Sequence, residues 1–154
     1  MNKDGLELLL SGHNYRYLED VKENAEIDMF EVDIDLPGGV YIWFQDDVNC
    51  LRLFMPRIIE VYEAVLPFAY KEINTLNFES FYGALSITGS KEKDNEQVKY
   101  FLNYINAVPL AREEGIYLSS EEFDEYITYI RYYVSKAIKS LSDIERSFTN
   151  GLNV

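Results

Sequence analysis

The side chains best suited to nucleophilic or acid–base chemistry are scarce in this sequence. His13 is the only histidine and Cys50 the only cysteine. A histidine-based triad needs a nucleophile on a sharp turn such as G-x-S-x-G, and the chain contains no such pattern. We therefore expect His13 to be a surface residue rather than a general base. Cys50 has only Arg52 nearby as a cation that could activate it, so we expect a packed, unreactive thiol.

Two groups of carboxylates could in principle do acid–base work or bind a hard cation. Glu31, Asp33 and Asp35 alternate with apolar residues and should share the wet face of a strand. Asp46 and Asp47 crowd a turn whose sequence, DDVN, does not match the D-x-[DN]-x-[DN]-G spacing of a calcium loop. Catalysis would also need an apolar pocket around one carboxyl group, which an exposed strand face does not supply. We therefore interpret both groups as solvated acidic surface.

No other motif predicts an active site. Neither of the glycine-rich phosphate-binding patterns, G-x-G-x-x-G and G-x-x-x-x-G-K-[ST], occurs in the chain. A thiolate metal site would need more ligands than the single cysteine provides. We predict that the protein is not an enzyme and that it has no catalytic residue, metal or cofactor.

The overall charge restricts the class of partner. Twenty-seven acidic residues stand against fourteen basic ones, which gives a net charge of −13 and a pI near 4.4. Nucleic acids and anionic membranes would be repelled, because their binding depends on cations of the protein. A basic protein would be attracted and steered, although the same charge also serves solubility alone. We expect a protein client, and neither a nucleic acid nor a membrane.

Length and composition are typical of one folded domain, and we place it at residues 1–154. Hydrophobic residues make up 47% and aromatic residues 15% of the chain, too much for a disordered segment. A single cysteine cannot form an intramolecular disulfide. The apolar stretch 6–10 is too short for the core of a signal peptide, and no run approaches the ~20 apolar residues of a membrane span. We therefore expect a cytoplasmic protein.

The first half of the sequence predicts a short helix followed by strands. A β-strand pattern of alternating apolar and acidic residues is clearest in 30–36, and the turn residues LPGG follow it at 36–39. The strand 40–45 is apolar on both faces, as expected in the centre of a sheet. The expected elements are a helix at 6–10 and an antiparallel meander of strands at 30–36, 40–45 and 50–55. The pattern of 15–22 fits either a strand or a helix, and we favour a first edge strand.

Beyond Pro56 the period of the pattern changes. Apolar residues from 58 to 77 fall on one helical stripe, and Pro67 inside it predicts either a kink or a helix that starts late. A fourth strand is expected at 81–88, a charged loop at 89–95 and a long fifth strand at 97–108. The predicted fold class is α+β: an antiparallel sheet, made of a three-strand meander plus a hairpin, with a middle helix and a long C-terminal amphipathic helix.

The last helix has the strongest pattern in the chain. Ser119 and Glu122 have the spacing of a capping box. Behind them runs an apolar seam with steps of four and three, flanked by tyrosines at 126, 129, 132 and 133; the seam residues are Phe123, Ile127, Ile130, Val134, Ala137, Leu141 and Ile144. The seam could pack on the sheet of its own chain. Alternatively, part of the seam or the tyrosine flank could meet a second subunit.

Two segments carry a resemblance to a known fold. Residues 73–77 (INTLN) end a helix that leads into a strand, and residues 118–123 (LSSEEF) open the last helix. With the element order, these resemble the type III secretion chaperone-like fold, and most closely its YbjN-type branch, over about residues 28–142. Pro67 departs from that pattern. The resemblance implies a small acidic protein, often a homodimer, that holds extended segments of other proteins on apolar patches and has no catalytic residues.

These observations support two functions of different classes. The first is a dimeric, chaperone-like or regulatory module that binds a protein client, with Tyr126, Tyr129 and Tyr133 as candidate contact residues. The second is an acidic neutraliser, either an immunity protein against a basic toxin or a DNA mimic. Its motivation is the acidic face that holds the other three candidate contact residues, Glu31, Asp33 and Asp35.

Overall fold

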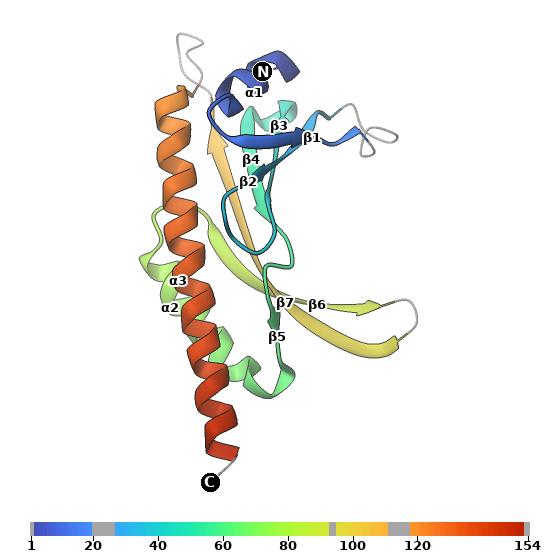
Figure 1. The fold of residues 1–154 in the computed structure, drawn as a ribbon, viewed down its shortest axis with the longest axis vertical. Coiled ribbons are helices and arrows are strands. Elements are labelled where there is room, and N and C mark those ends of the chain that lie inside the picture. The colour runs from blue at the N-terminus through green and yellow to red at the C-terminus, as the bar shows by residue number, and fades with distance from the viewer. Residues whose placement is uncertain (1, 20–26, 93–94, 111–117, 153–154) are drawn as a thin grey trace.

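The computed structural model describes residues 2–19, 27–92, 95–110 and 118–152. Its helices and strands follow one another in this order (Figure 1): α1 (Lys3–Leu10), β1 (Asn14–Tyr17), β2 (Met29–Asp33), β3 (Val40–Gln45), β4 (Cys50–Met55), β5 (Glu60–Val61), α2 (Leu66–Glu79), β6 (Ala84–Glu92), β7 (Asn95–Pro109) and α3 (Ser120–Leu152). Single turns of 3-10 helix at Asp46–Val48 and Glu63–Val65 follow β3 and β5.

The strands form one antiparallel sheet. Its order is β1-β2-β3-β4-β7-β5, and β6 pairs with β7 as well. β2, β3 and β4 are neighbours in the chain and in the sheet, so they form the expected meander. β6 and β7 form the expected hairpin, and β1 is an edge strand. The predicted α+β architecture is confirmed.

One face of the sheet is covered by helices. α2 and α3 lie along the same side of the strands, and α1 packs against α3 (Figure 1). Side chains at every second strand position point into this layer and are fully buried, among them Phe30, Ile42 and Leu53. They belong to one hydrophobic cluster with buried side chains of all three helices. The intervening strand residues therefore face the other way, on the side that α2 and α3 do not cover.

The long helix α3 covers the sheet with its apolar seam. Ser119 Oγ accepts a hydrogen bond from the Glu122 N–H at 3.1 Å, which is one half of the predicted capping box. The seam residues from 123 to 141 are at most 4% exposed: Phe123, Ile127, Ile130, Val134, Ala137 and Leu141. Of the two alternatives for this seam, packing on the chain's own core is the one that the structure shows.

The middle helix starts late, which is one of the two outcomes that Pro67 predicted. α2 begins at Leu66 and accommodates Pro67 in its first turn, where no N–H is needed. The apolar stripe that begins at Ile58 is therefore helical only from Leu66 onward. Arg57 has a positive φ of 52° and redirects the chain, and Ile58 N–H then donates to the Leu102 carbonyl at 2.8 Å. Residues 58–61 are thus bound to β7 as an extended segment.

Several element boundaries also differ from the sequence prediction. The expected loop at 89–95 is mostly strand, because the β6–β7 ladder continues to the pair Glu92 and Asn95. β6 begins at Ala84 rather than at 81. β2 ends at Asp33, and Asp35 follows it with a positive φ of 61°. Asp35 therefore lies in a turn and not on the strand face with Glu31.

Candidate protein-contact surfaces

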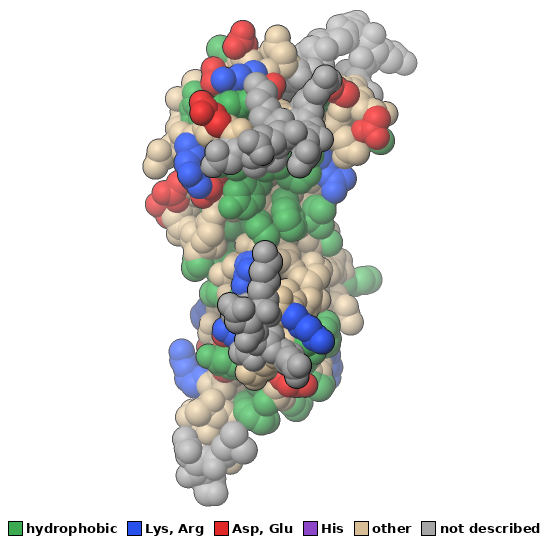
Figure 2. All heavy atoms as spheres, turned by 90° about the vertical axis from the view of Figure 1, so that its right-hand side faces the viewer, with side chains coloured by type: hydrophobic (Ala, Val, Ile, Leu, Met, Phe, Trp, Pro, Cys, Tyr) green, Lys and Arg blue, Asp and Glu red, His purple; other side chains and the backbone are tan. Residues whose placement is uncertain are grey.

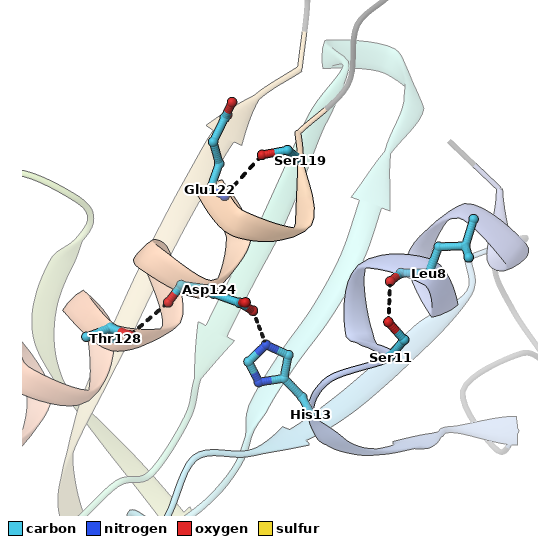
Figure 3. Close-up of polar contacts among 7 residues, drawn as sticks. All are labelled: Leu8, Ser11, His13, Ser119, Glu122, Asp124 and Thr128. Atoms are coloured by element: carbon cyan, nitrogen blue, oxygen red, sulfur yellow. Dashed lines mark hydrogen bonds and ion pairs between the residues drawn. The ribbon is translucent and has the colours of Figure 1, made fainter.

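His13 is a structural contact rather than a surface residue. Its Nε2 lies 2.6 Å from Asp124 Oδ1 on α3 (Figure 3). Its ring meets the Phe123 ring edge-on, with the ring centroids 5.4 Å apart. Only 15% of the His13 side chain is exposed, so the sequence prediction of a surface histidine is wrong. The contact ties the chain after α1 to the first turns of α3.

Three hydroxyl groups drawn around this pair form hydrogen bonds with backbone atoms. Thr128 Oγ1 donates to the Asp124 carbonyl, Ser11 Oγ donates to the Leu8 carbonyl, and Ser119 caps α3 (Figure 3). Cys50, at the start of β4, is partly buried with its thiol 3.3 Å from the Val48 carbonyl oxygen. Across the described ranges, His, Cys, Asp and Glu side chains form no group of three or more that could hold a metal ion.

The tyrosines of α3 hold the connection between α2 and β6. Tyr129 Oη accepts a hydrogen bond from the Phe81 N–H at 2.9 Å and lies 3.1 Å from Ser80 Oγ. Tyr133 Oη donates to Asn77 Oδ1 at 3.0 Å. Asn77 also bonds both backbone groups of Leu85, at 2.8 and 3.0 Å. The tyrosine flank is therefore a network that fixes residues 77–85 on the last helix.

This network presents two aromatic side chains to solvent. Phe78 is 93% exposed and Phe81 85%, unusually high values for phenylalanine. Beside them, the rings of Tyr82 and Tyr126 meet edge-on, with their centroids 4.8 Å apart. These two rings line a hollow of about 170 Å³ together with Glu122 and Glu125. We call Phe78, Phe81, Tyr82 and Tyr126 the aromatic corner.

The three candidate tyrosines do not share one environment. Tyr126 and Tyr129 are partly exposed, but Tyr133 is only 4% exposed and its hydroxyl is occupied by Asn77. Tyr133 therefore belongs to the core and is removed from the candidate contact surface. Phe78 and Phe81 are the exposed aromatic side chains at this place, and neither was among the contact residues predicted from the sequence.

The buried tyrosines make stability sensitive to alkaline pH. Burial raises the pKa of Tyr133 from 10.0 to about 12, and burial likewise raises the pKa of Tyr104. Between pH 10.0 and about 12 the unfolded chain loses the Tyr133 proton while the folded chain keeps it. The free energy of unfolding is therefore unaffected by this group below pH 10.0 and decreases as the pH rises toward 12.

We expect Tyr133→Phe to be less stable than the wild type below pH 10.0, by about 1 kcal/mol for the lost hydrogen bond. Above that pH the variant should lose stability less steeply than the wild type. Urea midpoints measured by circular dichroism at a series of alkaline pH values check this. Parallel pH profiles for the two proteins would contradict it.

The three acidic candidates do not form a uniform acidic face: Glu31 and Asp33 lie on β2 beside β1, and Asp35 lies in the turn that follows. Arg16 of β1 forms a charged pair with Glu31, with Nη2 2.6 Å from Oε2. Asp33 Oδ1 accepts a hydrogen bond from the Asp35 N–H at 2.9 Å, which closes the local turn. A shallow hollow of about 400 Å³ is lined by Arg16, Glu31, Asp33 and neighbouring residues of the 36–39 turn. One of its two carboxylates is thus already paired with a cation of the same chain.

The second face of the sheet carries a row of apolar side chains. The register places Glu31, Tyr41, Phe54 and Ile105 side by side across β2, β3, β4 and β7. The next row holds Met29, Trp43, Arg52 and Ala107. We call these two rows the open face. Figure 2 views the molecule from the side away from α3, and hydrophobic side chains gather in the middle of this view.

The open face is only partly exposed, yet none of it is covered by α2 or α3. Ile105 is 36% exposed, and Tyr41, Trp43 and Phe54 are partly exposed. The apolar pattern of residues 40–45 predicts a strand in the centre of the sheet, and β3 does lie between β2 and β4. In the structure only the face of Val40 and Ile42 is fully covered. An apolar face of this kind is a common site for binding another protein.

The arrangement of meander, hairpin and covering helices defines a fold class, and it is the YbjN-type fold that the sequence resembles. The solved structure of YbjN from E. coli, which is described as a candidate transcription regulator, aligns with 94% of this chain over 94% of its own. The TM-score is 0.61 and the sequence identity is 16%. The expected YbjN-type fold is confirmed, and at this identity the comparison concerns the fold alone. No family model and no curated protein sequence matches the chain.

Proposed function

We propose that this chain is a non-catalytic module that binds another protein on the open face of its sheet. The observation that carries the proposal is the row of Tyr41, Phe54 and Ile105, which stays partly exposed while the opposite face is closed by helices. Burying such side chains against a partner removes apolar surface from water, which is the main driving force of association.

Charge supports a protein as the partner. With a net charge of −13 the chain would repel the phosphates of nucleic acids and of anionic lipids. None of the helices in the described ranges is both long and apolar enough to span a bilayer. If the chain acts as a regulator, as YbjN is described, it would do so through proteins rather than by contacting DNA.

In finer terms, we propose a chaperone-like or regulatory role in the cytoplasm as a homodimer. The aromatic corner suits the contact between two copies, because exposed Phe78 and Phe81 lie beside the hollow lined by Tyr82 and Tyr126. A twofold axis there would pair each protruding ring with the hollow of the other copy. The open face of each copy would then remain available to the client.

The acidic neutraliser is not favoured by any contact at the β1 edge. Glu31 is paired with Arg16, and Asp35 is turned into the loop after β2.

The test is affinity capture with matched variants. We expect the double substitution Phe54→Ser and Ile105→Ser to abolish capture of a client that the wild-type protein retains from its native lysate. The control Leu8→Ser, at a 73% exposed position of α1, should capture the client as the wild type does. Circular dichroism melting confirms that all three proteins are folded. Equal capture by the open-face variant would contradict the proposal.

The oligomer is measured on the same samples. Light scattering of the wild type should give twice the chain mass of 18.0 kDa. The mass should not change in the open-face variant, since the proposed dimer contact lies elsewhere. A monomeric wild type would refute the homodimer and leave the client proposal standing.

A further inference from the structure

Arg52 is the one charged side chain in the second row of the open face, which also holds Met29, Trp43 and Ala107. It projects from β4 between Trp43 of β3 and Ala107 of β7, its direct partners in the ladder. The residues on either side of it on the same strand face are Cys50 and Phe54. A guanidinium is thus set into an apolar surface, where a charge costs free energy unless it is paired.

Arg52 Nε is buried and has no hydrogen-bond partner, and within the described part of the chain no carboxylate forms an ion pair with Arg52. Glu31, the acid on the neighbouring row, is held by Arg16 at 2.6 Å. Buried donors of this kind are nearly always satisfied in folded proteins. Because the Arg52 side chain as a whole is only partly buried, we take its unsatisfied donor as the place for a group that a partner supplies.

The geometry points to a carboxylate of the client as that group. The guanidinium offers its N–H groups in a planar fork that matches the two oxygens of a carboxylate. We infer that the open face recognises an apolar segment carrying one Asp or Glu side chain, which bonds Arg52 while its neighbours pack on Trp43, Phe54 and Ile105. This inference rests on the proposed function, because it names the chemistry of the client at the same face.

An internal acidic residue fits the surface better than a chain terminus. Apolar positions continue on both sides of Arg52, with Met29 and Trp43 on one side and Ala107 on the other. A peptide segment that crosses the sheet can pack on the apolar positions at both sides of Arg52. The strongly negative charge of the chain would repel a segment with many acids, so the carboxylate is expected to be isolated among apolar or basic residues.

The test uses a random 12-residue peptide library, displayed on phage and selected on the purified protein. Trp43 is the only tryptophan of the chain and lies beside Arg52, so its fluorescence reports occupation of the open face. We expect selected peptides that shift this fluorescence to share one Asp or Glu flanked by apolar residues. Synthetic peptides with amidated C-termini remove the terminal carboxylate as a competing explanation.

Affinities of one such peptide then test the pairing. Replacing its acid by the amide, or using Arg52→Met, should each weaken binding about tenfold or more, and the two changes together should cost little beyond either one. The control Arg146→Met, at an exposed position of α3, should bind as the wild type does. Because Arg52 Nε has no partner, Arg52→Met should unfold at a urea concentration no lower than the wild type.

The outcomes separate this inference from the proposed function. Peptides that shift Trp43 fluorescence without an acid, or that bind Arg52→Met equally well, overturn the carboxylate and leave the open face as a binding site. Failure of every selected peptide to shift the fluorescence overturns both. A shift of the Trp43 fluorescence with protein concentration, in the absence of peptide, would show that a second copy occupies the face and would also overturn the inference.

Discussion

Gly83→Ala is expected to lower the free energy of unfolding by roughly 2–5 kcal/mol. Gly83 has a φ of +76°, where a side chain strains the backbone. A Cβ at this position would overlap the Tyr104 hydroxyl and lie 2.6 Å from the Ile105 carbonyl oxygen. Neither group can retreat easily, since Tyr104 is fully buried and the backbone at Ile105 is paired with β4 and with β6. Urea unfolding followed by circular dichroism measures the loss.

Gly12→Ala is the matched control. A Cβ at Gly12 would have nothing within 4 Å, so this variant should stay within about 0.5 kcal/mol of the wild type. Equal stability of the two alanine variants would contradict the short distance between Gly83 and the β7 residues Tyr104 and Ile105. If Gly83→Ala fails to fold at all, Gly83→Ser should fail too, whereas Gly12→Ala should remain soluble and folded.

Asn77→Ala should destabilise the protein by roughly 3 kcal/mol, because three hydrogen bonds end on one side chain. The Asn77 amide donates to the Leu85 carbonyl and accepts from the Leu85 N–H, so it pairs with the edge strand β6 much as a further strand would. The same oxygen accepts the hydroxyl proton of Tyr133. With alanine, the buried Tyr133 hydroxyl and the Leu85 backbone would lose these partners.

The control for this change lies one turn earlier on the same helix. Asn74→Ala removes an exposed side chain, and its unfolding midpoint should match the wild type within about 0.5 kcal/mol. Hydrogen exchange adds a local readout, because the Leu85 amide should exchange much faster in Asn77→Ala. Unchanged protection of that amide would show that Asn77 does not bind it in solution.

The sequence predicts an element well when its pattern of apolar residues reflects contact with one buried face. In the meander, alternation between buried and exposed positions reflects one covered face, and the strand at 50–55 matches β4 at both ends. In α3, the seam residues repeat at helical spacing because they all meet the same sheet. Pro67 could be placed correctly, since proline is tolerated only in the first turn of a helix.

The errors lie where distant contacts decide the conformation. Val61 and Val65 are four residues apart and look helical, but pairing of Glu60 and Val61 with β7 keeps that segment extended. The charged residues near 91 suggest a loop because the hairpin is exposed there. An exposed strand and a loop have the same polar composition, so composition cannot separate them.

The candidate contact surfaces could be predicted only in part, because they too depend on contacts between distant parts of the chain. The aromatic residues of 40–45 could be recognised as unusual, but whether a helix covers their second face depends on the whole topology. Arg52 looked relevant only as a neighbour of Cys50, because the sequence does not show which charges find a partner. Tyr133 looked like its neighbours on α3, and only its contact with Asn77 shows that it belongs to the core.

The long strand β7 has a consequence for cooperativity. Its residues 100–105 are bound on both sides, to β6 along one edge and to β4, β5 or the segment 58–59 along the other. The meander and the hairpin therefore share a single strand instead of meeting at an interface. Neither half can open by separating from the other as a rigid body, so loss of structure in one half withdraws hydrogen bonds from the other.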